Sequence, residues 1–263
     1  MHLDKHAPGT FCWFELATND QPDAKDFYSN LFGWEFKDMP IGENDLYTLC
    51  MVNGRDAAAI YTMRAEQKQQ GVPPNWLVYI AVESADAAAQ QITAAGGTIL
   101  APPFDVMDLG RMTVANDPTG ATFAAWEARK NPGTGIVHAN GTVVWADLNT
   151  PDPARASAFY RDVFGWSVLA GEGKGPAGPN DYGHISAGGE FIGGIPPAAH
   201  FHTGTPPHWL IYFAVPDCEG AVAETIGDHG RILMPTMTME GQRKFAVLAD
   251  PQGAAFAVVQ TLR

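Results

Sequence analysis

Hydrophobic and polar positions follow two different periods along the first part of the chain. Residues 11–17 are rich in aromatic side chains and alternate in character, which is typical of a half-buried strand. Over residues 23–32 the apolar positions step by three and four, which predicts an amphipathic helix. Apolar runs at 34–36, 47–52 and 57–63, divided by turn-rich segments, predict three further strands. The first 63 residues therefore predict a βαβββ module.

A second module of the same order follows directly. It begins with a predicted strand at 76–82 and an alanine-rich helix at 85–95 that a Gly-Gly pair ends. Three more strands are predicted near 98–100, 111–115 and 122–126.

The whole pattern then returns, because the chain is a tandem duplication. The segment that starts at Gly9 recurs from Gly141, with 12 of 26 aligned positions identical. The tetrapeptides PPNW and DPTG of the first copy return as PPHW and DPQG. We expect a first domain at 1–128, a linker at 129–140 and a second domain at 141–263, with modules at about 9–63, 75–128, 141–196 and 208–262.

Composition narrows the class of protein. The 263 residues carry 16 Lys plus Arg against 29 Asp plus Glu, so the net charge of −13 repels nucleic acid and anionic membranes alike. No apolar run approaches the ~20 residues that span a bilayer, and the first residues lack the pattern of a signal peptide. The three cysteines form no C-x-x-C pair and fit a reducing compartment. We expect a cytoplasmic globular protein.

The repeated residues resemble a known superfamily. The segments Phe27-Tyr28 to Trp34 and Phe159-Tyr160 to Trp166, with the two DPxG turns, look like the vicinal oxygen chelate superfamily. That superfamily includes glyoxalase I, bleomycin-resistance proteins and extradiol dioxygenases. Within it, the chain is similar to a two-domain actinobacterial branch labelled glyoxalase-like or hydroxylase. The resemblance implies an α+β fold of tandem glyoxalase-like domains, in which two βαβββ modules form a curved mixed sheet, or cup, with helices outside.

The resemblance also implies where a metal ion binds in metal-dependent members. The matching positions of this chain hold no His, carboxylate or thiolate, because they are occupied by Trp13, Trp145, Leu77, Leu210, Ala124 and Ala257. We therefore predict no metal or other cofactor, with a divalent ion at a rearranged site as the alternative.

The duplicated strand residues are the first candidates for chemistry. Trp13 and Trp145 offer a flat stacking face for an aromatic ligand, or they fill the core where a metal ion would have been. Glu15 and Asp147 lie one step along the same strand face, where a carboxyl group with a raised pKa would act as general acid or base. The alternative for both carboxylates is a structural hydrogen bond.

Histidines distinguish the two copies. His184 and His208 lie in the second copy, where the alignment places Thr48 and Asn75 opposite them, and they suggest a proton shuttle or an unusual metal site. The predicted catalytic residues are Glu15, Asp147 and His184. The predicted ligand-binding residues are Trp13, Trp145, Tyr61, Trp76, Tyr79, Trp126, His208, Trp209 and Tyr212.

Three functions remain open from the sequence. The leading hypothesis is metal-independent binding of a hydrophobic or aromatic small molecule, as in the bleomycin-resistance branch. The second is an enzyme of the superfamily, a lyase, isomerase or hydroxylase/oxygenase-like catalyst. The third is a largely structural or interaction protein, in which the first copy has lost its pocket and stabilises the second. Four modules in one chain predict a monomer with an internal pseudo-dimer, with a homodimer as the alternative.

Overall fold

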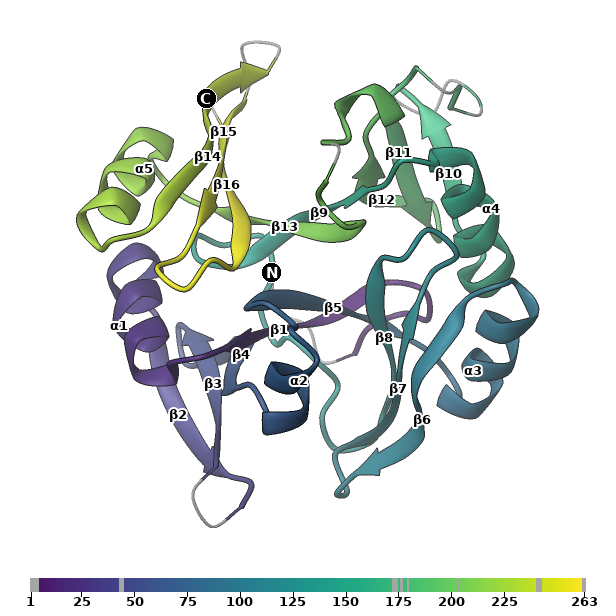
Figure 1. Cartoon of the computed structure of the whole chain (residues 1–263), viewed down its shortest axis with the longest axis horizontal. Helices are drawn as coiled ribbons and strands as arrows, with labels where there is room; N and C mark the ends of the chain where they lie inside the picture. The colour runs from purple at the N-terminus through teal and green to yellow at the C-terminus, as the bar shows by residue number, and fades with distance from the viewer. Residues whose placement is uncertain are drawn as a thin grey trace.

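The chain folds as two eight-stranded mixed sheets with helices between and beside them (Figure 1). This computed structural model describes residues 5–42, 45–171, 175, 177–178, 180–202, 204–239 and 243–261. Each sheet contains two βαβββ modules, so the predicted α+β fold of tandem domains is confirmed.

The first sheet has the strand order β2-β3-β4-β1-β5-β8-β7-β6. The central strands β1 and β5 are antiparallel, while β1 pairs in parallel with β4 and β5 in parallel with β8. All the helices and strands expected from the pattern are present, together with a short helix α2 that the pattern did not predict. The elements are β1 (Phe11–Thr18), α1 (Gln21–Phe32), β2 (Glu35–Pro40), β3 (Leu46–Val52), β4 (Arg55–Thr62), α2 (Ala65–Gln69), β5 (Asn75–Ala81), α3 (Ala85–Ala94), β6 (Thr98–Val106), β7 (Gly110–Asn116) and β8 (Thr122–Ala128).

The second sheet repeats this topology in the order β10-β11-β12-β9-β13-β16-β15-β14. Its elements are β9 (Val143–Asn149), α4 (Pro153–Phe164), β10 (Ser167–Ala170), β11 (Gly183–Ala187), β12 (Glu190–Ile195), the 3₁₀ turn η1 (Ala198–His200), β13 (His208–Ala214), α5 (Cys218–Gly227), β14 (Arg231–Met239), β15 (Arg243–Ala249) and β16 (Ala255–Thr261).

Local sequence explains how the first helix of each copy begins and ends. The Asp20 side chain accepts a hydrogen bond from the backbone N–H of Asp23, and Pro22 occupies the first turn, where its missing N–H costs nothing. Gly33 ends the helix at φ 67°, a left-handed conformation that residues with a Cβ rarely adopt. Asp152 and Gly165 do the same for α4, so the duplicated sequence encodes duplicated caps.

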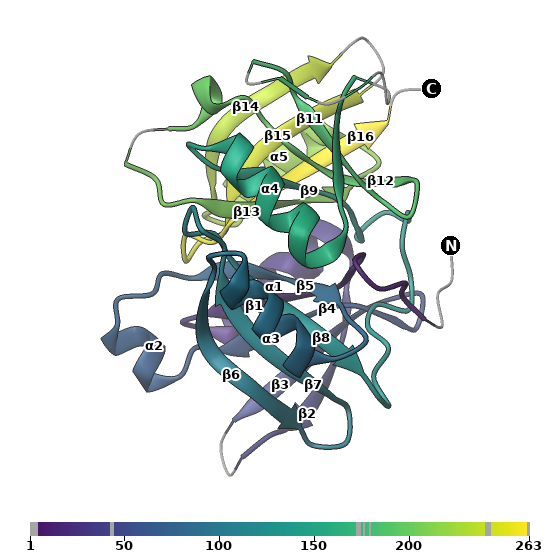
Figure 2. The same ribbon diagram turned by 90° about the vertical axis from the view of Figure 1, so that its right-hand side faces the viewer.

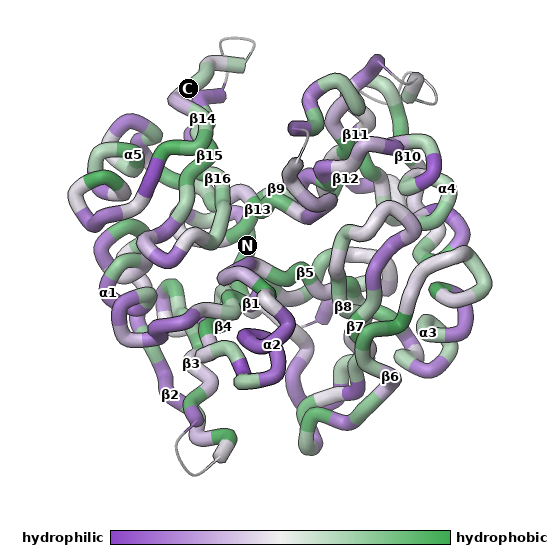
Figure 3. Tube along the Cα trace, in the orientation of Figure 1, coloured by the Kyte–Doolittle hydropathy of each residue, from purple (hydrophilic) through white to green (hydrophobic). Residues whose placement is uncertain are grey.

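Strand alternation divides the side chains between two faces of each sheet. One face packs on the helices and on the other sheet, and its buried residues form a single hydrophobic core that includes both copies. The other face is free of the four long helices α1, α3, α4 and α5, and each sheet curves around it, with the short helix α2 beside the first sheet on that side (Figure 1). We call it the inner face of the sheet; it corresponds to the predicted cup. Figure 3 shows hydrophobic segments along the central strands of both sheets.

The two copies exchange equivalent contacts across their interface. The Trp34 indole donates a 2.7 Å hydrogen bond to the Gly141 carbonyl, and the Trp166 indole donates a 2.6 Å bond to the Gly9 carbonyl. Helix α1 contacts α5, and helix α3 contacts α4. In Figure 2, α4 lies above α3. The repeated FGW segments therefore build the contact between the copies, which form an internal pseudo-dimer.

Two predicted ligand-binding residues belong to this same core. Trp76 and Trp209 are buried on the helix face, where their indoles donate 3.1 Å hydrogen bonds to the hydroxyls of Tyr28 and Tyr160. Strand alternation turns them away from the inner faces, so their assignment to a ligand site was wrong.

The segment between β8 and β9 packs closely against the first sheet. The backbone N–H of Thr134 donates to the Cys12 carbonyl at 2.8 Å, and a Cβ on Gly133 would lie 2.2 Å from the same oxygen. Gly133 has φ 113°, so both space and conformation require glycine there. Among the residues the structure describes, no helix is long and apolar enough to cross a membrane.

Candidate functional site

A buried carboxylate lies at the centre of each inner face, and tyrosine hydroxyls hold it. In the first sheet, Glu15 accepts a hydrogen bond from the Tyr79 hydroxyl at 3.0 Å and from the Tyr47 hydroxyl at 2.7 Å. The Trp13 indole donates in turn to the Tyr47 oxygen at 2.8 Å. Glu15, Tyr79 and Trp13 come from the neighbouring strands β1 and β5.

The second sheet repeats this cluster with aspartate in place of glutamate. Asp147 accepts hydrogen bonds from Tyr182 at 2.5 Å and Tyr212 at 2.8 Å. The Trp145 indole N–H lies 2.9 Å from Asp147 Oδ1 and 2.8 Å from the Tyr182 hydroxyl. Each of these four side chains has a counterpart in the cluster that contains Glu15.

Tyr47 and Tyr182 were missed by the sequence analysis, and they are equivalent. Ala59 pairs with Glu15 and Gly194 pairs with Asp147, so positions 59 and 194 correspond. Leu49 pairs with Ala59 as His184 pairs with Gly194. The counterpart of His184 is therefore Leu49, and the expected alignment with Thr48 was wrong by one residue. The available signal was the tyrosine that each copy carries two positions earlier.

The difference between glutamate and aspartate is matched on the neighbouring strand. A Cβ built on Gly194 would lie 1.9 Å from the Tyr182 hydroxyl oxygen. The shorter aspartate draws this hydroxyl toward the sheet, into space that only glycine leaves free. Opposite the longer Glu15 the strand carries Ala59, and Tyr47 still reaches the carboxylate.

Burial dominates the protonation of both carboxyl groups. Removal from water raises the pKa of Glu15 and of Asp147, and the tyrosine hydrogen bonds oppose this shift only in part. The same burial, with the adjacent carboxylates, raises the pKa of Tyr212 and Tyr47. All the tyrosines of the two clusters therefore keep their hydroxyl proton at neutral pH and act as hydrogen-bond donors.

His184 adds a histidine to the second inner face. Its Nδ1 is buried and has no hydrogen-bond partner among the described residues. Its ring lies 4.9 Å from that of Tyr182, 5.2 Å from that of Phe191 and 6.1 Å from that of Trp145. A buried nitrogen without a partner is costly unless something else satisfies it.

The structure separates His208 from His184. His184 lies on β11 and His208 on β13, with β12 and β9 between them in the sheet. His208 is at the end of its strand, opposite Asn149, and its Nδ1 is 2.9 Å from the Pro206 carbonyl. Burial lowers the pKa of His208.

The donor set does not fit a divalent metal ion. Both carboxylates already accept hydrogen bonds on both oxygens, and the paired positions across β5 and β13 hold Leu77 and Leu210. In the part of the chain that the structure describes, no three His, Cys, Asp or Glu side chains converge as metal ligands require.

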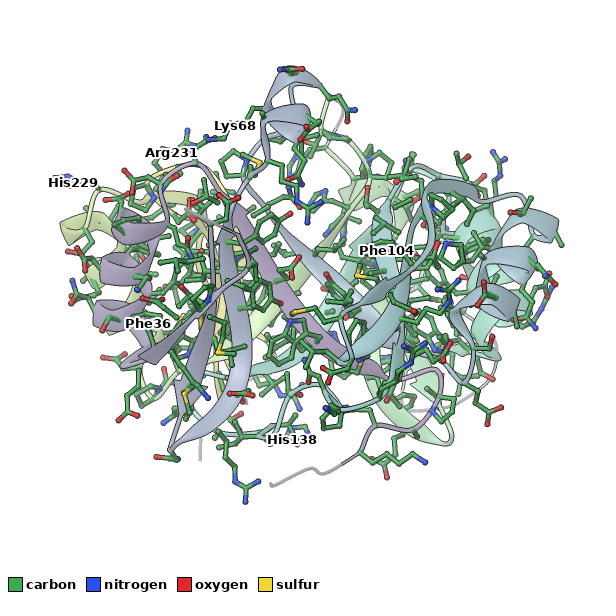
Figure 4. All side chains as sticks on the ribbon, turned by 90° about the horizontal axis from the view of Figure 1, so that it is seen from below. Phe36, Lys68, Phe104, His138, His229 and Arg231 are labelled. Carbon is green, nitrogen blue, oxygen red and sulfur yellow. The ribbon has the colours of Figure 1, made fainter. Side chains whose placement is uncertain are left out.

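The two inner faces differ in accessibility. In the first, Trp13, Tyr79 and Trp126 are only 4%, 5% and 6% exposed, and they form a closed hydrophobic cluster. Figure 4 looks toward this sheet from below, with Phe104 of β6 labelled. In the second, Trp145 and Tyr212 are half-buried.

Tyr61 and Trp126, two further predicted ligand-binding residues, also lie on the first inner face. The Tyr61 hydroxyl accepts a 2.9 Å hydrogen bond from Gln67 in α2, and burial raises its pKa to about 12. Trp126 donates from its indole to the Asn131 carbonyl at 3.0 Å. Contacts within the chain therefore occupy the polar atoms of both residues.

The family of the chain follows from its sequence and agrees with this architecture. The model of the glyoxalase/bleomycin resistance protein/dioxygenase superfamily matches residues 10–125 and again 135–258. The chain therefore belongs to this superfamily, with two tandem domains.

Two curated relatives match the chain over almost its whole length. "Putative glyoxylase CFP32" of Mycobacterium tuberculosis is 37% identical, over 97% of this chain and 96% of that protein. "Anthracycline biosynthesis protein DauV" of Streptomyces sp. (strain C5) is 33% identical, over 98% of this chain and 95% of that protein.

Solved structures share the fold at low sequence identity. The Mn(II)-bound glyoxalase from Novosphingobium aromaticivorans has a TM-score of 0.64 at 13% identity and covers 97% of this chain and 83% of its own. The 2,3-dioxygenase LapB from Pseudomonas sp. KL28 has a TM-score of 0.66 at 13% identity and covers 98% and 94%. At this identity the likeness concerns the fold and not the chemistry.

Proposed function

We propose that the protein binds a planar aromatic small molecule, without a metal ion, on the inner face of its second sheet. The observation that carries this proposal is that Trp145 and Tyr212 beside Asp147 are half-buried, whereas their counterparts beside Glu15, Trp13 and Tyr79, are almost fully buried. Aromatic rings that remain partly exposed around a fixed polar centre are typical of small-molecule sites.

The walls of this face support an apolar ligand. Met237 and Met239 of β14 are each 49% exposed and pair with residues 245 and 243 of β15, and Phe191 beside His184 is 41% exposed. Thioether side chains adapt to ligands of irregular outline. The unpartnered Nδ1 of His184 can accept a hydrogen bond from a phenol or enol hydroxyl in the tautomer that carries the proton on Nε2.

The name of one curated relative supports this class of ligand. DauV is named for anthracycline biosynthesis, and anthracyclines are planar, fused-ring aromatic molecules with phenolic hydroxyls. We extend to this chain only that chemical class, because its aromatic cluster and its histidine acceptor are suited to it.

Trp145 provides a test that is specific to the proposed site. The other six tryptophans are at most 6% exposed, so acrylamide should quench mainly Trp145. Alizarin, a planar dihydroxyanthraquinone, should quench the same fluorescence in a saturable titration. Trp145→Phe should remove this response and weaken binding measured by calorimetry by roughly tenfold, the loss of one stacking contact. Trp13→Phe is the matched control in the first sheet and should leave both measurements unchanged.

Equal effects of the two substitutions, or no saturable binding of alizarin or of an anthracycline, would reject the proposed site.

A second function, proton-transfer catalysis, is favoured by one observation. The Asp147 carboxylate is fully engaged by its donors, so the group free to exchange a proton with a ligand is His184, next to it. His184→Gln should then abolish turnover of an enolisable aromatic ketone while alizarin still binds. Asp147→Ala should also abolish turnover, because it releases Tyr182; activity that survives both substitutions would reject catalysis.

A further inference from the structure

We infer that Trp126 closes the inner face of the first sheet, and that Val259 at the equivalent position keeps the second open. The chain then binds one aromatic molecule instead of two. This inference rests on the proposed function for its ligand, but not for the closure itself.

Strand register establishes that the two positions are equivalent. Trp126 pairs with Met112 on β7 and with Ala81 on β5. Val259 pairs with Phe245 on β15 and with Ala214 on β13, which are the matching strands. A bulky indole in the first sheet is thus replaced by a small aliphatic side chain in the second.

Glycine makes room for the indole. A Cβ on Gly110 would lie 2.3 Å from the six-membered ring of Trp126, closer than any real contact. Gly110 pairs with Ala128 as Arg243 pairs with Thr261, so the second sheet carries arginine at the equivalent position. An aromatic side chain at position 259 therefore cannot adopt the position of Trp126 unless Arg243 is also replaced.

The indole is held firmly in the closed position. It donates to the Asn131 carbonyl, and its ring centre lies 6.3 Å from that of Tyr79, with an edge-to-face angle of 73°. Asn131 is fixed in turn, because its backbone N–H donates to Leu109 at 3.0 Å. The segment that connects the two copies thereby keeps the first site shut.

Behind Trp126, the first sheet keeps a polar cluster equivalent to that of the second site. Glu15 retains both tyrosine donors, and Trp13 lies in the same hydrophobic cluster as Trp126. The exception is Leu49, which stands where the second sheet has His184. Removal of the indole should therefore open a site that stacks aromatic rings but lacks the histidine acceptor.

The test separates access to the site from ligand binding. In a Trp145→Phe background the remaining tryptophans are buried, so acrylamide quenching should be weak. Adding Trp126→Val should raise the quenching constant toward the wild-type value by exposing Trp13. With Trp145 intact, Trp126→Val should also raise the stoichiometry of alizarin from one to two per chain in calorimetry, with the second site weaker.

The reciprocal variant closes the second site and covers the case in which Trp126→Val does not fold. Val259→Phe combined with Arg243→Gly should lower the quenching of Trp145 by acrylamide and abolish alizarin binding. Val259→Phe alone is the matched control and should have the smaller effect.

The possible outcomes separate the two ideas. Unchanged quenching in folded variants, as shown by circular dichroism, overturns the assignment of Trp126 and Val259 whatever the ligand is. Quenching that changes as expected, with no alizarin bound by any form, supports the closure and rejects the proposed function.

Discussion

The fit of the Tyr182 hydroxyl between Asp147 and Gly194 leads to a quantitative prediction about stability. Gly194→Ala places a methyl group 1.9 Å from the present position of the Tyr182 hydroxyl, so this hydroxyl must move away from the carboxylate. A hydrogen bond to a charged group contributes about 1.5–3 kcal/mol, and we expect the free energy of unfolding to fall by about 2 kcal/mol.

Asp147→Glu alone should be costly for the opposite reason. It adds a methylene group to a residue that is 5% exposed and already bonded by three donors. Overpacking of this kind costs about 1–3 kcal/mol. If the two changes acted independently, the double variant would lose about 4 kcal/mol, the sum of these two estimates.

We expect the double variant to lose only about 2 kcal/mol, because it recreates the Glu15 and Ala59 pair of the first sheet. The implied coupling free energy between the two positions lies within the usual range for residues in contact. Urea unfolding followed by circular dichroism measures all four proteins of this cycle. Gly227→Ala is the control for the backbone effect, since a Cβ there meets nothing within 4 Å. Additive losses within error would refute the reasoning that the two positions are matched.

Two further predictions concern protonation and the interface between the copies. Burial raises the folded-state pKa of Asp147 above the ordinary value of 3.8, so the folded chain binds more protons than the unfolded chain between these two pKa values. This contribution to stability is lost as pH rises through the folded pKa. The free energy of unfolding of wild type minus that of Asp147→Asn should accordingly fall from pH 4 to pH 7 in urea titrations, as should the same difference for Glu15→Gln; a rising difference would contradict the assignment of burial as the cause. Trp34→Phe and Trp166→Phe each leave one buried carbonyl of the other copy without its donor, and each should lower the free energy of unfolding by about 1–3 kcal/mol, whereas an effect from only one of them would show that the interface is not symmetric.

The sequence determined the fold nearly completely. Amphipathic spacing in 23–32, the capping residues Asp20 and Gly33 and the alternation in 11–17 are local signals, and the duplication stated each of them twice. Such signals depend on residues close in the chain, which is why helix and strand positions could be predicted from one sequence.

The candidate site was predicted in part. Trp13, Glu15, Trp145 and Asp147 were placed correctly on one strand face, because alternation along a single strand has a fixed period. Trp76 and Trp209 were misplaced, because their strands fit either register until the core that buries them is known.

Only the tertiary structure decided which inner face is open. Tyr47 and Tyr182 reach carboxylates that lie more than 30 residues away in the sequence. Trp126 closes the first sheet because Gly110, on a neighbouring strand, leaves it space. These contacts arise from the pairing of distant strands. A one-residue error in the expected alignment of those strands gave His184 the wrong counterpart in the first copy. The sequence thus carried the list of side chains, while strand pairing determined which of them meet.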